Sequence, residues 1–345
     1  MNAFRREIAR FNYLVPSELI AQKPARPRDS ARLLVFNRAT GAVSLDTFAH
    51  LDAYLPKHAV LVFNKTKVIP ARLELQKETG GRVKIVYLSH QGPRVRCLAD
   101  RPLVLGSKLF FKKKYIAQVK AREGGEWVFE FRMTALRVIP FFEKHGTMPI
   151  PPYIKQSPLS GRELKSEYQT VFAETKGSVA APTASLHFTK RLIARLKRQG
   201  FHIEYVTLHV GRGTFASLTE EQWHKGELHG EYFYIEARTQ KRLNEAKKSK
   251  RQIVAIGTTV TRTLESATDA RGNITKLSGT TRMFIREHDK MRFVDALVTN
   301  FHVPRSSLMM LVSAFVGRKK LLELYQMAIK AKFRLFSFGD GMLVR

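Results

Sequence analysis

Two patterns of hydrophobic and polar residues divide this chain of 345 residues. Between residues 70 and 149, short stretches rich in β-branched and aromatic residues alternate with glycine-containing turns. Short strands at such spacing predict a small antiparallel barrel or sandwich. Elsewhere, apolar strands alternate with stretches of helical periodicity, which predicts an α/β layer structure. We therefore expect a discontinuous main α/β domain, residues 1–69 and 150–345, with an inserted small antiparallel β-barrel domain at 70–149.

The same patterns predict individual elements. Apolar residues at 192, 193 and 196 follow Thr189 and precede Gly200, which are start and stop signals for one helix. Two strands around a helix are expected within residues 32–64. The other expected elements are strand-forming stretches at 82–88, 108–121, 126–133, 201–208, 252–257, 293–299 and 335–338, and helices at 237–249, just after 257 and at 306–331.

The segment Gly177–Thr189 has no charged side chain apart from His187, yet serine, threonine and proline distinguish it from a core strand. Its small residues allow a backbone to approach a ligand closely, and Pro182 stiffens the turn. The helix expected after Thr189 would place this loop at a helix N-terminus, which favours anions and lone-pair-rich groups. Thr183 and His187 are therefore candidate ligand residues, although His187 could instead bond only the backbone.

Further polar residues follow three expected strands. His209 and the glycine loop Gly211 and Gly213 follow the first strand, Thr258 and Thr259 the second, and Asn300 and His302 the third. Loops after the strands of an α/β sheet are the usual place for ligands. A site rich in histidine and threonine but poor in carboxylates suits a cofactor with hydroxyl groups and a zwitterionic tail.

Charge indicates the kind of partner. The chain has 60 lysine and arginine residues against 29 acidic residues, a net charge of +31. A nucleic acid is the commonest partner of such a protein, and a generally basic proteome is the alternative. The densest basic run, residues 238–251, is either a solvated helix face or a surface that contacts phosphates.

Cysteine content and hydropathy argue against a disulfide-bonded, secreted or membrane-spanning protein. Cys97 is the only cysteine, so an intrachain disulfide and a multi-cysteine metal site are excluded, as in a reducing cytoplasm. The N-terminal residues lack the apolar core of a secretory signal. No apolar run approaches the roughly 18 residues that a membrane span requires. We therefore expect a cytoplasmic protein without a membrane partner.

The chain resembles the S-adenosylmethionine:tRNA ribosyltransferase-isomerase family of queuosine biosynthesis. The resemblance covers nearly the whole chain, in family order. Its strings are RDSARLL (28–34), VFNKTKVIPARL (62–73), MPIPPYI (148–154), EYQTVFA (167–173), GSVAAPTASLHFT (177–189), TLHVGRGTF (207–215), VAIGTTVTRTLES (254–266), LVTNFHVPRSSLMMLVSAF (297–315) and FRLFSFGDGML (333–343).

This resemblance implies an enzyme that uses S-adenosylmethionine as a ribosyl donor and needs no metal. The acceptor it implies is the 7-aminomethyl-7-deazaguanine wobble base of tRNA with a GUN-type anticodon, and the product is epoxyqueuosine with release of adenine and methionine. We expect the protein to act as a monomer. The sulfonium acidifies the C5′ hydrogens, and adenine departure requires a proton donor, so imidazole suits both steps.

Residue roles follow on that basis. His187, His209, His229 and His302 are the catalytic candidates, in no assigned order, with Glu231 as a candidate acid or orienting group. The candidates for the cofactor are Thr183, Gly211, Gly213, Thr258, Thr259 and Asn300. The candidates for the tRNA substrate are Asn64, Arg72, Tyr168, Gln169, Arg262 and Asp340. For several of these residues, the alternative to a functional role is a structural one, in packing, capping or a domain hinge.

The chain departs from the family pattern inside its motifs. Lys65 replaces an aspartate, Ser185 a glycine and Gly341 an alanine, while Thr280 and residues 286–289 also differ. Ser185 would be strained if that position has a positive φ. These changes leave open a non-catalytic or altered-specificity tRNA-binding relative. An ordinary methyltransferase is the third alternative, supported only by the glycine loop at 211–213.

Overall fold

A nine-stranded sheet and a closed six-stranded barrel organise the part of the chain that the computed structural model describes, residues 2–123, 125–211 and 218–345. The sheet has the order β15-β13-β12-β3-β14-β16-β17-β1-β2. Its strands are β15 Ser278–Met283, β13 Glu227–Tyr234, β12 His202–Leu208, β3 Val60–Asn64, β14 Ile253–Ile256, β16 Ala296–Asn300, β17 Gly341–Val344, β1 Arg32–Phe36 and β2 Val43–Thr47.

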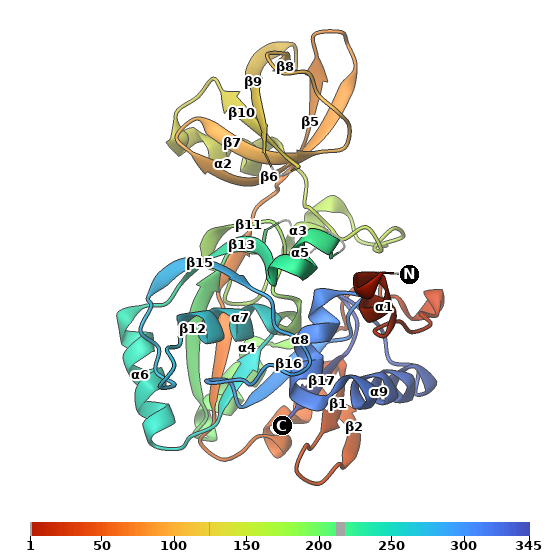
Figure 1. The fold of residues 1–345 in the computed structure, drawn as a ribbon, viewed down its shortest axis with the longest axis vertical. Helices are drawn as coiled ribbons and strands as arrows, with labels where there is room; N and C mark the ends of the chain where they lie inside the picture. Colours follow the sequence, from red (N-terminus) through yellow and green to blue (C-terminus); the bar gives the residue numbers. More distant parts are fainter. Residues whose placement is uncertain (1, 124, 212–217) are drawn as a thin grey trace.

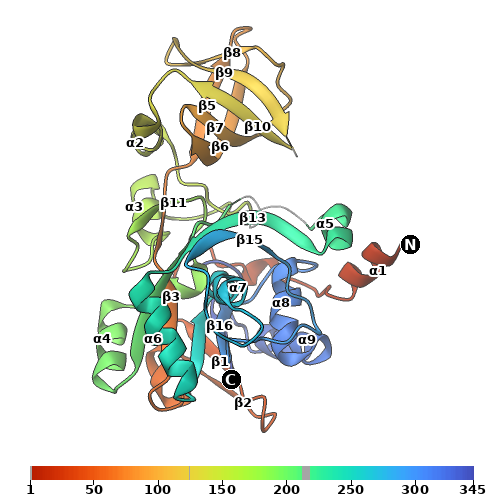
Figure 2. The same ribbon diagram turned by 60° about the vertical axis from the view of Figure 1, so that its left-hand side comes forward.

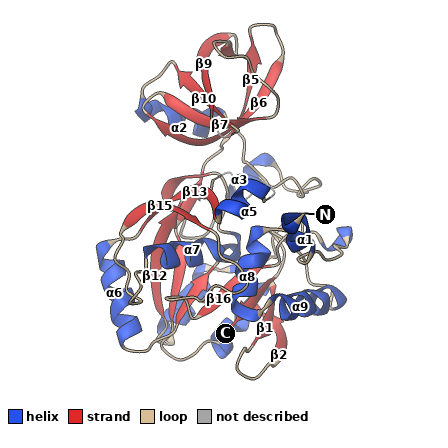
Figure 3. Cartoon of the chain, viewed as in Figure 1, coloured by secondary structure: helices blue, strands red, loops and turns tan. Residues whose placement is uncertain are grey.

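Helices cover both faces of this sheet (Figures 1 and 3). Alternate residues of β3 explain this: Val60 and Val62 join one apolar core with α6, α7, α8 and α9, whereas Leu61 and Phe63 join the other with η3 and α4. The α-helices are α1 Ala3–Ala9, α2 Ala135–His145, α3 Gly161–Glu167, α4 Lys190–Arg198, α5 Glu220–Lys225, α6 Ala237–Lys248, α7 Thr258–Ala267, α8 Ser307–Val316 and α9 Arg318–Lys330, and the 3₁₀ helices are η1 Ser17–Leu19, η2 Arg28–Ser30, η3 Phe48–Tyr54 and η4 Thr183–His187. None of the described helices is long and apolar enough to cross a membrane.

The four neighbouring strands β12, β3, β14 and β16 run parallel, so their carboxyl ends meet at one edge of the sheet. Asn64 and Asn300 end two of these strands, and Gly257 directly follows a third. The chain leaves this edge after β3 to form the barrel, which stands above it in Figure 1. The fold therefore brings the strand-end residues together beside the barrel.

The barrel has the strand order β10-β7-β6-β5-β8-β9 with antiparallel pairing throughout. Its strands are β5 Arg72–Lys77, β6 Arg82–Gln91, β7 Arg94–Ala99, β8 Lys108–Phe111, β9 Lys114–Glu123 and β10 Glu126–Phe131, and β4 Thr66–Val68 pairs with β11 Thr175–Ser178 below it. This confirms the expected α/β architecture with a small antiparallel barrel. We infer that residues 70–149 form the inserted unit and that 1–69 and 150–345 fold together.

Two chain segments connect the barrel to the sheet (Figure 2), and they pair with each other. The Arg72 amide donates to the Thr147 carbonyl at 3.1 Å, and the Thr147 amide donates to the Arg72 carbonyl at 2.7 Å. Gly146 lies so close to Pro70 that a Cβ on it would sit 1.8 Å from the Pro70 carbonyl oxygen. This crossing of two backbones therefore requires glycine.

Several expected stretches are divided or differ in type. The stretch 108–121 is two strands, because Lys112 and Lys113 form a turn with φ of 48° and 65°. The stretch 306–331 is two helices separated by Gly317, whose φ is 75°. The helix within 32–64 is the 3₁₀ helix η3, and β13 and β15 were not predicted.

The expected strand at 335–338 lies further along the chain, as β17. Phe336 has a φ of 70°, which a strand cannot accommodate, and Leu335 makes only an isolated bridge to Ile20. The helix after Thr189 is confirmed, since the Thr189 hydroxyl accepts a hydrogen bond from the Leu192 amide at 3.0 Å and so caps α4.

Candidate active site

A pocket lies at the carboxyl ends of the parallel strands, where Val210, Gly257 and Asn300 contribute to its wall. Much of the remaining wall is apolar, from Tyr153, Leu218, Leu228, Ile285, Val303, Leu308, Leu311 and Phe336. Eight of the residues proposed from the sequence line it: Thr183, His229, Glu231, Thr258, Thr259, Arg262, Asn300 and His302. An apolar pocket with a few converging polar groups is typical of a small-molecule site.

The N-terminus of α7 forms part of the wall. Gly257 precedes the helix with a φ of 100°, and no side chain caps the first turn. Gly257, Thr258 and Thr259 all line the pocket. Uncapped amides and the helix dipole favour a ligand group with negative charge or lone pairs. The sequence places the motif Gly257–Thr259 directly after the strand, although only its two threonines were proposed as ligand residues.

Asn300 connects the pocket to a buried histidine. Its Nδ2 donates to the carbonyl oxygens of Phe336 at 3.1 Å and Asp340 at 3.4 Å, which fixes the orientation of the amide. The same Nδ2 lies 3.1 Å from His187 Nε2, so that nitrogen is the acceptor. Asn300 Oδ1 is buried and has no partner among the described residues.

His187 lies behind the pocket wall rather than in it. Its ring stacks on Phe48 with centroids 4.2 Å apart. Burial, with a smaller effect from Arg334 and Arg28, lowers the pKa of His187 from 6.5 to about 3. The ring is therefore neutral at pH 7, and its geometry favours orienting Asn300 over transferring a proton.

His302 lines the pocket directly. Its backbone amide donates to the Tyr325 hydroxyl at 2.9 Å, and its carbonyl accepts from the Tyr13 hydroxyl at 2.6 Å, which fixes the residue between α9 and the N-terminal chain. The ring contacts Thr299 through Nε2 at 3.3 Å, while Nδ1 is buried without a partner in the described residues. Burial lowers the pKa of His302 to about 4, so the imidazole is neutral at pH 7.

A buried ion pair joins α7 to β13 beside these groups. Arg262 donates through Nη1 to Glu231 Oε2 and through Nε to the Met283 carbonyl at 3.1 Å. The other oxygen of Glu231 accepts from the Gly211 amide at 2.9 Å. Both carboxylate oxygens are therefore engaged, which favours a positioning role for Glu231 over an acid role. Arg262 Nη2 is buried and has no partner within the described residues.

Three pocket residues thus each hold one unpartnered buried polar atom: Arg262 Nη2, Asn300 Oδ1 and His302 Nδ1. Leaving a buried donor or acceptor unpaired costs about 1–3 kcal/mol, and such groups are rare unless a ligand or water pairs with them. The Phe336 backbone, held at a φ of 70° in the same wall, is a further strained feature of the kind that clusters at functional sites.

Comparison with known proteins identifies the family. A family model described as queuosine biosynthesis protein matches residues 8–344. The chain belongs to this family. It is 41% identical to the S-adenosylmethionine:tRNA ribosyltransferase-isomerase of Carboxydothermus hydrogenoformans, over 97% of this chain and 98% of that protein. It is 40% identical to the protein of the same name from a Thermoanaerobacter species, over 97% and 98% of the two chains.

The solved structures include a member of the same family. The crystal structure of the S-adenosylmethionine tRNA ribosyltransferase from Thermotoga maritima matches with a TM-score of 0.56 and 33% sequence identity. The match covers 97% of this chain and 100% of that one. In the described residues of the present chain, no group of three or more His, Cys, Asp or Glu side chains is arranged to hold a metal ion.

The other proposed family residues lie outside the pocket. His209 contacts the Thr66 hydroxyl through Nδ1 at 2.8 Å, and burial lowers its pKa. Asn64 is fully buried and bonds both the amide and the carbonyl of Leu208, with its Nδ2 also 3.3 Å from Thr259. Gly211 reaches the site only through its bond to Glu231. Gly213 lies outside the described residues.

Four proposed tRNA contacts also have other positions. Tyr168 is fully buried, and Gln169 bonds both the amide and the carbonyl of Val68, just before the barrel. Asp340 is buried and accepts from the backbone amides of Arg32 and Arg334. Arg72 is exposed on the barrel. The geometry of the three buried or bonded residues favours structural roles.

The departures from the family pattern are accommodated. Lys65 pairs with Glu236 at 2.7 Å and with Glu174 at 2.9 Å. Ser185 lies in η4 and is not among the residues with positive φ, so the expected strain is absent. Gly341 has no room for a Cβ, which would lie 2.9 Å from the Phe48 ring that stacks on His187.

The changed turn at residues 286–289 is also well supported. The Arg286 guanidinium lies over the rings of Trp223 and Phe284, 4.5 and 4.6 Å from their centroids. Glu287 accepts from the Arg318 amide at 2.7 Å, at the start of α9. We have no structural explanation for the change at Thr280 beyond its place in β15.

The two neutral histidines make stability fall in mild acid. A folded pKa of about 3 for His187 and about 4 for His302, against 6.5 when unfolded, means that the unfolded chain binds more protons below pH 6.5. Their contribution is complete above pH 6.5 and is lost as the pH falls toward 4. From pH 7.5 to 5 we expect each to reduce the unfolding free energy by about 2 kcal/mol. Urea denaturation at both pH values should show a smaller drop for His187→Gln; an unchanged drop would contradict the assignment.

Proposed function

We propose that this chain is an S-adenosylmethionine:tRNA ribosyltransferase-isomerase. It transfers the ribosyl group of S-adenosylmethionine to the 7-aminomethyl-7-deazaguanine base of tRNA and isomerises it, giving epoxyqueuosine, adenine and methionine. Family membership and the shared name of the relatives support the activity. The observation that carries it to this chain is the pocket with three unpartnered polar atoms, on Arg262, Asn300 and His302.

The donor would occupy this pocket. Asn300 Oδ1 supplies an acceptor and Arg262 Nη2 a donor, both buried and already held in position by other bonds. The uncapped start of α7 suits the carboxylate of the methionine part. The apolar wall suits the adenine ring and excludes water from the sulfonium.

We assign proton transfer to His302. It lines the pocket, is neutral at pH 7 and has a buried Nδ1 without a partner in the described residues. Such a nitrogen can remove the C5′ proton next to the sulfonium, and the resulting imidazolium can return a proton to departing adenine. His187 would act through Asn300 as a positioning residue.

The proposal also covers the tRNA partner, the oligomeric state and the cellular location. The net charge of +31 suits a tRNA, which we propose carries a GUN-type anticodon. We further propose that the protein acts as a monomer in the cytoplasm. The non-catalytic alternative is disfavoured because relatives that match nearly the whole chain share the enzyme's name.

Incubation with S-adenosylmethionine and tRNA that carries the deazaguanine precursor tests the activity. We expect epoxyqueuosine in the nucleoside mass spectrum and one adenine per product, with neither formed from tRNA that has guanine at the wobble position. His302→Gln should bind the donor with little change but lose turnover by about a hundredfold or more. Adenine release that is independent of the acceptor, or a fully active His302→Gln variant, would refute the corresponding proposal.

A further inference from the structure

The barrel carries a surplus of unpaired positive charge. Residues 70–149 contain 16 basic and seven acidic residues. Each of those acids forms an ion pair, namely Glu74, Glu78, Asp100, Glu123, Glu126, Glu130 and Glu143. Only five basic residues of the range take part in these pairs, because Glu143 pairs with Lys176 outside it. The other 11 basic residues of the range form no ion pair in the described residues.

Two of these basic residues line a hollow in the barrel. The hollow has a volume of about 560 Å³, within the range of about 300–1,000 Å³ that is typical of ligand pockets. Arg72 and Lys84 line it as exposed cations, and no side-chain bond or ion pair of theirs occurs in the described structure. The two acids of its wall, Glu74 and Asp100, are paired with Arg82 and Arg101.

An aromatic residue and a histidine complete the wall. Phe111, at the end of β8, packs against His145 with ring centroids 4.8 Å apart. The ammonium group of Lys112 lies 5.7 Å from the Phe111 ring. Burial, then the positive charges of Lys144 and Lys112, lower the pKa of His145, and Lys144 directly precedes His145 at the end of α2.

The lysine turn beside Phe111 has an unusual backbone. Lys112 and Lys113 both adopt a left-handed conformation, with φ of 48° and 65°. A two-residue hairpin turn of this kind favours Asn-Gly, and a left-handed residue other than glycine costs about 1 kcal/mol or more. Two lysines in these positions are thus a costly choice for stability, which favours a role for their charge.

We propose that this barrel groove, the hollow lined by Arg72, Lys84, Phe111 and His145 together with the adjacent Lys112 and Lys144, is a second contact for the tRNA, separate from the pocket at the sheet. The cations bind backbone phosphates, and Phe111 offers a ring on which an unpaired base stacks. A barrel that combines a basic groove with aromatic side chains is the usual platform for single-stranded nucleic acid. The inference rests on the proposed function, since that function supplies the RNA.

The test removes charge without disturbing the fold. The groove variant Lys84→Gln/Lys112→Asn/Lys144→Gln alters three exposed lysines, and asparagine tolerates the left-handed backbone at 112. We expect tRNA affinity at 0.1 M salt to fall by about ten- to a hundredfold. The slope of log affinity against log salt should become shallower by about 2–3, because fewer counterions are released.

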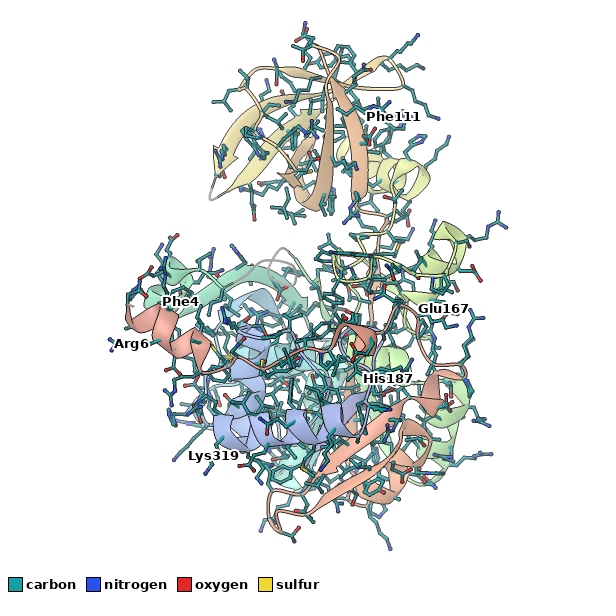
Figure 4. The ribbon with its side chains drawn as sticks, turned by 90° about the vertical axis from the view of Figure 1, so that its right-hand side faces the viewer. Phe4, Arg6, Phe111, Glu167, His187 and Lys319 are labelled. Carbon is teal, nitrogen blue, oxygen red and sulfur yellow. The ribbon has the colours of Figure 1, made fainter. Side chains whose placement is uncertain are left out.

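A matched control exists at the opposite end of the molecule. The variant Lys319→Gln/Lys330→Gln/Lys332→Asn removes three exposed lysines on and after α9, and Lys332 is also left-handed, with a φ of 57°. Figure 4 shows Phe111 on the barrel and Lys319 far below it. This control should keep the affinity and salt slope of the unaltered protein within about twofold.

Phe111→Leu tests stacking separately from charge. It should weaken tRNA binding by about tenfold with an unchanged salt slope, whereas Phe110→Leu, the neighbour that packs on Tyr115, should not. In turnover assays the groove variant should raise KM for tRNA and leave KM for S-adenosylmethionine and kcat unchanged. The groove proposal would be overturned if the groove and control variants lost tRNA affinity equally, or if the groove variant kept its KM for tRNA. In either case, adenine release by the unaltered protein would still support the proposed activity. Absence of adenine release from the unaltered protein would instead reject the proposed function.

Discussion

Arg262→Met is expected to destabilise the fold by about 3–5 kcal/mol and to abolish measurable turnover. The substitution leaves the carboxylate of Glu231, which is 5% exposed, buried without its cation. It also removes Nη2, an unpartnered buried donor of a residue that lines the proposed S-adenosylmethionine pocket. Urea denaturation measures the first effect, and adenine release with acceptor tRNA measures the second.

A double variant separates stability from chemistry. In Arg262→Met/Glu231→Gln the buried charge is gone, and the glutamine oxygen still accepts from the Gly211 amide. We expect most of the unfolding free energy to return while turnover stays lost. Recovery of turnover in the double variant would show that Arg262 matters only through its ion pair.

Gly146→Ala should cost about 3 kcal/mol or more and should disturb the barrel most. The new Cβ would lie 1.8 Å from the Pro70 carbonyl oxygen and 2.7 Å from that of Phe142, both backbone atoms that cannot rotate away. The two connecting segments must therefore separate, which breaks the paired bonds between Arg72 and Thr147. Thermal unfolding should show a lower Tm, and tRNA binding should weaken more than donor binding.

Gly161→Ala is the matched control for that substitution. Gly161 opens α3, has no positive φ, and a Cβ on it would meet nothing within 4 Å. We expect its Tm to be unchanged or slightly raised, since alanine favours a helix. If the two alanine variants had equal stability, the close crossing of the connecting segments would be contradicted.

The sequence predicted the architecture because periodicity and turn residues are local signals. Strand-like stretches between glycine turns indicated the barrel, and strand-helix alternation indicated the α/β sheet, both of which the structure confirms. The predicted strand and helix boundaries differed from the structure where single residues adopt a positive φ, as at Lys112, Gly317 and Phe336. A lysine or phenylalanine with positive φ gives no signal in hydrophobic periodicity.

Site residues show the same division. The polar residues after strands were visible in the sequence, and parallel pairing of β12, β3, β14 and β16 predicts that they meet. Sequence could not tell which side chains face the pocket. His187 and His302 look alike as histidines within motifs, yet one is buried against Phe48 and the other lines the wall.

The sequence by itself determined the family, the layer architecture and the excess of positive charge, since each depends on residue identity and order alone. Tertiary structure alone decided the ion pair of Arg262 with Glu231, the contact between Asn300 and His187, and the crossing at Gly146. These contacts join residues far apart in the chain. Their distances, burial and unpaired atoms arise only when the strands are packed side by side.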